Sequence, residues 1–281
     1  MSRKNDAADN ADHDVVVDFG KEWEAFDQSV LSDSERKQQF EAYFALFPWQ
    51  RLLSNAVGFD VGCGSGRWAV LVAPRVGHLH CVDPSDAINV TRKNLRHFSN
   101  CSFHRCSVDD LPFADNSMDF GYALGVLHHI PDTQQGLVDC ARKLKPGAPL
   151  LVYLYYAFDN QPVWFKGLWR TSDLIRRLIS RLPYRVKYIL CQLVAVFVYF
   201  PLARAAKGLE RAGVSVHSWP LSAYRSRSLY SMRTDALDRF GTRLEKRFTK
   251  EQIQNMMENA GLDDVRFSLQ APFWCAVGFK K

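Results

Sequence analysis

A glycine-rich turn that follows a short apolar segment constrains this chain more than any other feature. Residues 57–61 end in Asp60-Val61, and the next six residues read Gly-Cys-Gly-Ser-Gly-Arg. Glycine permits a tight turn and a close approach of the backbone to a ligand. A helix is expected to open after the loop, so that its first amide groups face the same ligand. The segment therefore predicts a strand–loop–helix unit that holds a nucleotide-like cofactor.

The spacing of the glycines and a downstream acid narrow the choice of cofactor. Dinucleotide-binding loops read G-x-G-x-x-G, with an acid at the end of the second strand. Here the third glycine comes one residue early, whereas Asp83 follows a second predicted strand, 21 residues after Gly62. A carboxylate at that position suits two ribose hydroxyls, because it offers two acceptor oxygens. An ordinary strand-to-helix turn would explain the loop alone, but not the loop together with Asp83.

The order of the predicted elements indicates an α/β fold. Strands are expected at about 57–61, 78–82, 101–106, 118–124 and 149–155, with helices between them. This alternation predicts a parallel sheet with right-handed crossovers. A C-terminal helix at about 249–260, with a capping box at Thr249 and Gln252, precedes two apolar runs, 265–269 and 273–279. These runs predict a closing hairpin.

Together with three further segments, the glycine loop resembles the cofactor motif of class I S-adenosylmethionine-dependent methyltransferases. The segments are 108–113, 118–131 and 142–147, and they occur in the order of that family. The resemblance covers about residues 50–156. It implies S-adenosylmethionine as the cofactor, no metal, and a Rossmann-like, doubly wound, mostly parallel seven-stranded sheet. The sheet is expected to have a C-terminal antiparallel hairpin strand and a helical insertion before strand six.

The implied cofactor site lies at the carboxyl ends of the strands, where such sheets bind ligands. Its expected residues are Asp60, Gly62, Cys63, Gly64, Gly66, Asp83, Val108, Asp109 and Leu124. Asp60 is expected to orient the loop or to receive the cofactor's ammonium group. Relatives often carry Asp where this chain has Ser107, so Asp109 is the expected substitute at the adenine amine. The aromatic stretch 19–26 resembles an N-terminal element that folds over the cofactor in some relatives, with ordinary packing as the alternative.

His128 and His129 are the candidates for a catalytic base. They follow the fourth predicted strand, near the expected methyl group, and imidazole titrates near neutral pH. A base is needed only if the acceptor is a hydroxyl or an ammonium group. The alternative interpretation is that the pair shapes the turn and packs against the cofactor.

A basic insertion follows the fifth predicted strand. Residues 157–250 contain 18 Lys and Arg against 6 Asp and Glu, whereas the net charge of the whole chain is only +6. Helical spacing of apolar residues predicts a helix over 163–182, and the apolar run 188–200 follows, too short at thirteen residues to span a bilayer. The insertion is interpreted as a helical lid with solvated charges or as a surface that rests on an anionic membrane through residues 163–207. Nucleic-acid binding is disfavoured, because the basic residues form no known nucleic-acid module.

The segment that leads back to the core, 224–239, is rich in arginine and tyrosine. The arginine side chain suits a carboxylate or phosphate of a substrate, and ion pairs with nearby acids are the alternative. Tyr156, Tyr230 and Arg233 are the predicted contacts of the acceptor.

The predicted domains are a disordered tail at 1–14, a cofactor-binding core at 15–156, a basic acceptor cap at 157–248, and a helix and hairpin at 249–281 that complete the core. Seven cysteines without a C-x-x-C pair, and the lack of an apolar leader, favour a cytoplasmic protein, with the inner membrane face as the alternative. The predicted activity is methyl transfer to a small-molecule or lipid-like acceptor. A Rossmann-type NAD-dependent dehydrogenase and a non-catalytic S-adenosylmethionine-binding scaffold are the alternatives.

Overall fold

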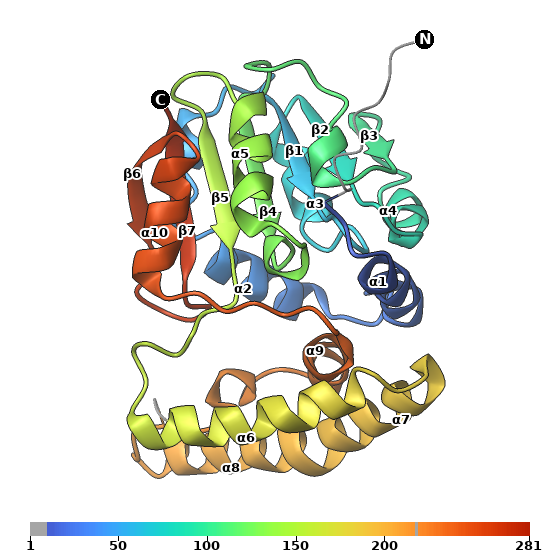
Figure 1. Cartoon of the computed structure of the whole chain (residues 1–281), viewed down its shortest axis with the longest axis vertical. Coiled ribbons are helices and arrows are strands. Elements are labelled where there is room, and N and C mark those ends of the chain that lie inside the picture. The colour runs from blue at the N-terminus through green and yellow to red at the C-terminus, as the bar shows by residue number, and fades with distance from the viewer. Residues whose placement is uncertain (1–9, 217–218) are drawn as a thin grey trace.

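A seven-stranded sheet forms the centre of the fold in the computed structural model, which describes residues 10–216 and 219–281 (Figure 1). The strands are β1 (Val57–Val61), β2 (His78–Val82), β3 (Cys101–His104), β4 (Phe120–Leu124), β5 (Pro149–Tyr153), β6 (Leu262–Phe267) and β7 (Cys275–Lys280). Their order is β3-β2-β1-β4-β5-β7-β6. Neighbours among β1 to β5 pair in parallel, and β7 pairs antiparallel with both β5 and β6. The predicted fold class is therefore confirmed.

Helices cover both faces of the sheet. They are α1 (His13–Ala25), α2 (Asp33–Tyr43), α3 (Ala69–Val72), α4 (Ala87–Asn94), α5 (Thr133–Lys143) and α10 (Lys250–Asn259). Because side chains alternate along a strand, the two faces carry separate hydrophobic clusters. On β4, Ala123 belongs to the cluster of Leu137 and Ile253, and Tyr122 to the cluster of Phe40.

The C-terminal elements follow local sequence signals. The Thr249 side chain accepts from the Gln252 amide, and the Gln252 side chain accepts from the Thr249 amide, which confirms the predicted capping box of α10. β6 begins at Leu262, earlier than the apolar run that predicted it. The reason is that β6 is an edge strand, on which Asp263 and Asp264 face solvent.

The helices between β5 and α10 form a cap. They are α6 (Val163–Ile179), α7 (Tyr184–Val194), the π-helical segment Ala195–Tyr199, α8 (Phe200–Arg211) and α9 (Leu229–Gly241). In Figure 1, α6, α7 and α8 form a layer below the core, and α9 lies between that layer and the core. We call α6, α7, the π-helical segment and α8 the cap layer.

The thirteen-residue apolar run belongs to a much longer helix than its sequence indicated. By length and composition alone, the helix Tyr184–Arg211, 28 residues long, could cross a membrane, and 28% of its most apolar window is buried. The helix continues past Pro201, which has no amide hydrogen to donate and directly follows the π-helical segment, where the regular hydrogen-bond pattern of the α-helix is already interrupted.

The N-terminal segment is ordered earlier than predicted. Residues 1–9 of the predicted tail lie outside the described residues. Asn10 is buried and its side chain donates to the Asp132 carbonyl oxygen at 2.9 Å, and Asp12 caps α1, which begins at His13. The prediction of disorder is therefore wrong for residues 10–14, because these polar side chains make specific hydrogen bonds.

Candidate active site

The glycine loop lies at the carboxyl end of β1. Gly62 and Gly64 have φ angles of 70° and 54°. A Cβ atom on Gly62 would lie 2.3 Å from Val126, and one on Gly64 would lie 2.8 Å from the Trp23 indole nitrogen. Both positions therefore require glycine. The Gly64 amide donates to Asp83 Oδ2 at 2.9 Å, so the loop is fixed to the acid that follows β2.

The helix after the loop is shorter than expected. A turn follows Gly66, and α3 begins only at Ala69 and is four residues long. The loop backbone, rather than a long helix, therefore supplies the amide groups at this end of the sheet.

Two buried acids flank the loop. Asp83 is 7% exposed, and its Oδ1 accepts from the Ser85 amide at 2.9 Å and the Ser85 hydroxyl at 2.5 Å. Asp60 is 1% exposed, and its Oδ2 has no hydrogen-bond partner within the described residues. Burial raises the pKa of Asp60 to about 8. A buried carboxyl oxygen without a partner fits a ligand that brings a donor or a cation, as the ammonium of S-adenosylmethionine does.

The N-terminal helix lies over the same end of the sheet. Trp23 contacts Gly64, and Gly20 lies against Ser85 and Asp86. Asp109, at the predicted adenine end, accepts from the Asn10 amide at 3.4 Å and from the Ser107 hydroxyl. A cofactor held by the glycine loop would therefore lie beneath α1, which supports the resemblance of residues 19–26 to a covering element.

The remaining predicted cofactor residues lie close to the same end of the sheet. Val108 is buried, and Cys63 Sγ lies 3.4 Å from the Thr91 hydroxyl of α4. Cys63 and Leu124 line a cavity, which Asp83 and Val108 do not.

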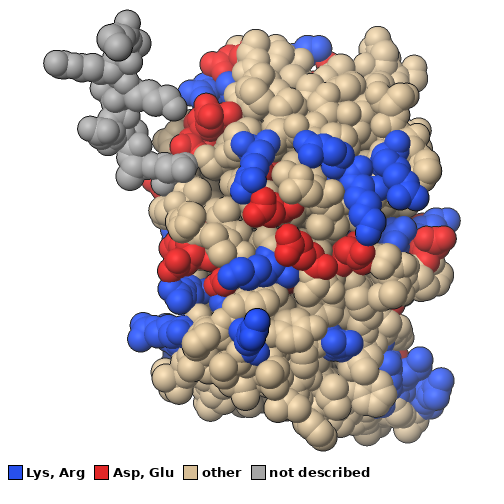
Figure 2. All heavy atoms as spheres, turned by 90° about the vertical axis from the view of Figure 1, so that its right-hand side faces the viewer, with Lys and Arg blue, Asp and Glu red and all other residues tan. Residues whose placement is uncertain are grey.

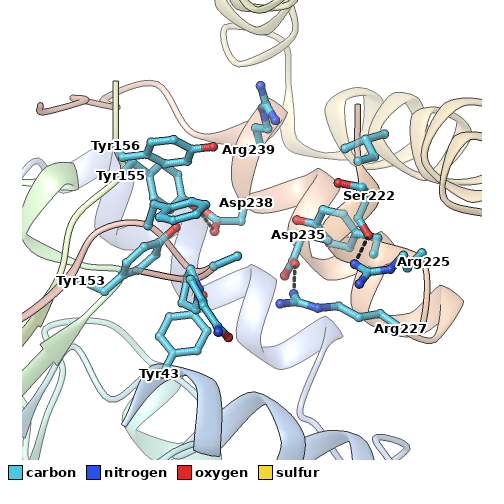
Figure 3. A pocket seen from close by; sticks show the side chains of 18 of the residues that line it. Tyr43, Tyr153, Tyr155, Tyr156, Ser222, Arg225, Arg227, Asp235, Asp238 and Arg239 are labelled. Atoms are coloured by element: carbon cyan, nitrogen blue, oxygen red, sulfur yellow. Dashed lines mark hydrogen bonds and ion pairs between the residues drawn. The ribbon is translucent and has the colours of Figure 1, made fainter. Parts of the chain in front are cut away.

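This cavity has a volume of about 810 Å³ and lies between the core and the cap (Figure 3). Gly62, Cys63, Leu124 and Gly125 line it from the core, and Phe165 lines it from α6. Figure 3 shows a group of tyrosines facing acids and arginines of the cap segment. The labelled residues are Tyr43, Tyr153, Tyr155, Tyr156, Ser222, Arg225, Arg227, Asp235, Asp238 and Arg239.

Neither candidate histidine lines the cavity. His128 is fully buried, and its ring stacks on Tyr155 with centroids 3.9 Å apart. Burial lowers the pKa of His128 well below its usual value, so this imidazole is uncharged at neutral pH. His129 is also buried, with Nδ1 2.7 Å from the Leu244 carbonyl oxygen. Both rings therefore lie behind the wall that Tyr155 forms.

Only one of the three predicted acceptor contacts lines the cavity. Tyr156 does, whereas the Tyr230 hydroxyl accepts from the Gln28 amide at 2.9 Å and Arg233 Nε donates to Gln192 at 2.5 Å. Residues three apart share a face of a helix. Tyr230 and Arg233 therefore lie on one face of α9, where they tie it to the N-terminal segment and to α7.

The opposite face of α9 carries acids that the sequence did not single out as site residues. Asp235 and Asp238 line the cavity together with Glu22 of α1. Asp235 pairs with Arg227 at 3.2 Å. Glu22 is 3% exposed, and burial, followed by Asp238 and Asp235, raises its pKa well above the usual value. The three-residue spacing of Asp235 and Asp238 indicates that both acids lie on one face of a helix. The sequence does not show, however, which face of α9 points into the cavity.

Comparison with known proteins agrees with this arrangement. Residues 59–152 match a family model described as a methyltransferase domain. This range extends from β1 to β5 and contains the glycine loop, Asp83 and both histidines.

Several curated proteins are similar to parts of the chain. It is 29% identical to phosphoethanolamine N-methyltransferase 2 of Caenorhabditis elegans, over 46% of this chain and 28% of that protein. It is 32% identical to the ubiquinone biosynthesis O-methyltransferase of Hahella chejuensis, over 38% of this chain and 43% of that protein. It is 27% identical to the demethylmenaquinone methyltransferase of Tropheryma whipplei, over 65% of this chain and 79% of that protein. The chain thus spans less than half the length of the first two relatives.

Among solved structures, an S-adenosylmethionine-dependent methyltransferase from Aquifex aeolicus is 13% identical, with a TM-score of 0.45 over 89% of this chain and 97% of that chain. A similarity at this level does not bear on function. The family model, the strand order and the glycine loop agree with one another. Residues 59–152 therefore form a methyltransferase domain of the class I, S-adenosylmethionine-dependent type.

Proposed function

We propose that this protein transfers the methyl group of S-adenosylmethionine to a small-molecule or lipophilic acceptor held between the core and the cap. The observation that carries the proposal is the 810 Å³ cavity, which extends from the glycine loop to the cap. The cofactor, when bound, supplies an already activated methyl group. The chain itself then has to bind the cofactor and the acceptor, to align the acceptor with the methyl group and to exclude water.

The cofactor would be held by residues around the glycine loop. Asp83 would accept from the ribose through Oδ2, which keeps an acceptor site beside the Gly64 amide, whereas Oδ1 already accepts from the Ser85 amide and hydroxyl. The unpartnered oxygen of Asp60 would accept from the ammonium group. Val108 and Asp109 would contact the adenine, and Trp23 would cover the loop.

The lining of the acceptor end favours an acceptor with apolar or aromatic character. Most of its large side chains are aromatic: Tyr43, Tyr153, Tyr155, Tyr156, Phe158, Phe165 and Phe273. Aromatic side chains bind other rings through offset stacking and edge contacts. Arg227 pairs with Asp235, and Arg225 pairs with Glu210, so these four charges of the lining are compensated within the protein.

Methyl-labelled S-adenosylmethionine tests the proposal. The full chain, Asp83→Ala and the exposed-site control Asp110→Ala are each incubated with a whole-cell extract, and label is counted in organic, aqueous, protein and nucleic-acid fractions. We expect label in the organic fraction with the wild type and the control, and loss of label with Asp83→Ala. Binding of NAD instead of S-adenosylhomocysteine would favour a dehydrogenase. Tight binding of S-adenosylhomocysteine without any transfer of label would favour a non-catalytic scaffold.

We also propose that the cap layer rests on an anionic membrane surface. Its outward side chains form a long apolar face: Val163, Trp164, Leu168, Leu174, Ile175, Leu178, Val186, Ile189, Leu193, Val196, Phe197, Val198 and Phe200 are all exposed. Exposed arginines border it at positions 170, 177, 181 and 185. In Figure 2, the lower part of the visible face shows scattered Lys and Arg side chains and little Asp or Glu. An apolar face with a basic border is typical of helices that lie in the membrane interface.

Some basic residues of the insertion serve the fold instead. Arg176 is buried and donates to Asp173 at 2.7 Å, and Lys187 is buried and pairs with Asp18. Arg204 donates to the carbonyl oxygens of Arg225 and Arg227. These three residues therefore fit the interpretation of the insertion as a helical lid over the core. The membrane proposal rests instead on the exposed apolar face and the exposed arginines.

Flotation with vesicles tests the membrane proposal. We expect the protein to float with phosphatidylcholine vesicles that contain phosphatidylserine, and more weakly with phosphatidylcholine alone. Protein that remains at the bottom of the gradient with both vesicles would contradict the proposal.

A further inference from the structure

The exposed residues of the cavity lining mark the mouth of the cavity. Most of them belong to two connecting segments, 213–215 after α8 and 269–271 between β6 and β7. Leu269 is 81% exposed and Val214 is 50% exposed, although both line the cavity. None of the residues in the two segments is charged. The cavity therefore opens to the surface between two uncharged segments, each of which carries an exposed aliphatic side chain.

The first turn of α6 connects the outer face of the cap layer with the cavity. Val163 and Trp164 are 84% and 55% exposed, whereas Phe165, the next residue, lines the cavity. In Figure 1, α6 begins at the end of the cap layer that lies on the same side of the molecule as β6 and β7. The exposed apolar face of the cap layer therefore reaches the cavity at this turn.

Aromatic side chains continue inward from that turn. The ring centroids of Trp164 and Phe165 are 5.7 Å apart, and those of Phe165 and Phe158 are 5.3 Å apart. The Phe158 ring lies 4.5 Å from that of Tyr156, which in turn lies 5.7 Å from that of Phe273. These separations are typical of rings in contact. A series of rings thus leads from the exposed face of α6 into the cavity, and Phe273 extends it toward the connection between β6 and β7.

The end of the cavity beside the glycine loop is lined with rings as well. The Tyr43 centroid lies 5.1 Å from that of Tyr153 and 4.8 Å from that of Trp68, which directly follows the loop residues. Figure 3 shows Tyr43 and Tyr153 on the same side of the cavity as Tyr155 and Tyr156. The lining is therefore aromatic from the mouth to the glycine loop, and it fits a long apolar molecule.

We propose that the mouth of the cavity faces the membrane, and that the acceptor is an amphiphile dissolved in the bilayer, which enters between residues 213–215 and 269–271. This inference rests on the proposed function and deepens it, because it names the source and the chemical class of the acceptor. An apolar molecule that left the bilayer through water would expose its apolar surface, which is unfavourable. Val214 and Leu269 insert into the membrane surface, so that the acceptor passes from lipid to the aromatic lining without this exposure. Its apolar chain lies along the rings, and the atom that receives the methyl group lies beside the glycine loop.

Membrane partitioning of matched variants tests the position of the mouth. Leu269 and Leu53 both lie outside the cap layer and are 81% and 73% exposed, but of the two only Leu269 lines the cavity. We expect Leu269→Ser to partition roughly tenfold more weakly than the wild type into sucrose-loaded vesicles of phosphatidylcholine and phosphatidylserine, because it loses the transfer of an exposed leucine into lipid. Val214→Ser, on the other segment of the mouth, should weaken partitioning by roughly threefold. Leu53→Ser should partition as the wild type does.

Transfer of label tests the source of the acceptor. A cell lysate is separated by ultracentrifugation into membranes and a soluble fraction, and each is incubated with the full chain and methyl-labelled S-adenosylmethionine. We expect label that extracts into organic solvent with the membranes, and none with the soluble fraction. With the membranes, Leu269→Ser should lower the rate of transfer by the same factor as it lowers partitioning. Its dissociation constant for S-adenosylhomocysteine should change by less than about twofold, because the cofactor residues are untouched.

The outcomes separate the inference from the proposed function. Equal partitioning of the wild type and Leu269→Ser, or equal losses in Leu269→Ser and Leu53→Ser, overturns the inference. Label that appears with the soluble fraction alone also overturns it, although methyl transfer to a small molecule then stands. If neither fraction accepts label, the proposed function fails, and the partitioning of the variants by itself decides whether the mouth faces the membrane.

Discussion

The apolar outer face of the cap layer predicts the effect of a single substitution on membrane binding. Full burial of a leucine side chain stabilises by about 1.5–3 kcal/mol. Leu178 is 71% exposed on α6, so its transfer into the acyl region would contribute about 1–2 kcal/mol. Since 1.4 kcal/mol corresponds to a factor of ten, Leu178→Ser should weaken partitioning about 5- to 30-fold.

Leu53 provides a matched control, because it is 73% exposed but belongs to the core. Sedimentation with sucrose-loaded vesicles of phosphatidylcholine and phosphatidylserine gives the partition coefficient of each variant. We expect Leu53→Ser to partition as the wild type does. Equal partitioning of the wild type and Leu178→Ser, or equal losses in both variants, would refute the assignment of the cap layer as the membrane-facing surface.

Three further predictions concern the fold and the cofactor loop. Lys187→Met should lower the free energy of unfolding by about 1–3 kcal/mol, because it removes a buried ammonium that donates to the Gly241 carbonyl oxygen and pairs with Asp18, whose side chain is 20% exposed. Lys93→Met, at a lysine that is 67% exposed, should lower it by less than about 1 kcal/mol in the same urea titration. Burial raises the pKa of Asp60 to about 8 from an ordinary value near 4, so its contribution to stability is present below about pH 4 and is lost as the pH rises through 8. Between pH 6 and 8, the free energy of unfolding of the cofactor-free wild type should therefore fall by about 2–3 kcal/mol relative to that of Asp60→Asn, as measured by urea unfolding. If the free energies of the two proteins change with pH in parallel, this prediction is wrong. Gly62→Ala should abolish S-adenosylhomocysteine binding and destabilise more than Gly147→Ala, because both glycines have positive φ but only the Cβ at 62 meets a side chain at 2.3 Å. Calorimetry that shows equal binding by these two variants would contradict the steric argument.

The alternation of strands and helices and the capping box of α10 could be predicted from the sequence because they depend on residues that are close together in the chain. The glycine loop and Asp83 belong to the same class of features, since a strand end, a turn and the next strand lie within about 25 residues. Side-chain alternation and glycine spacing are enough to place them.

The interior of the cap could not be predicted in the same way. Helical spacing places Arg233 and Asp235 on different faces of α9, but it does not show which face meets the cavity. Helical spacing also does not show that Lys187 is buried whereas Arg185, two residues earlier, is exposed. These distinctions depend on which helix packs against which, and that is a property of the tertiary structure.

By itself, the sequence determined the α/β core, its cofactor loop and its family, because these are encoded by local patterns of glycine, acids and apolar residues. The cavity between the core and the cap, and the contact among His129, Tyr155 and Asp238, were decided by the tertiary structure alone. These side chains come from segments that are up to 109 residues apart in the chain, from 129 to 238, and no short-range pattern links them. They meet only because the cap folds back and packs α9 against the carboxyl end of the sheet.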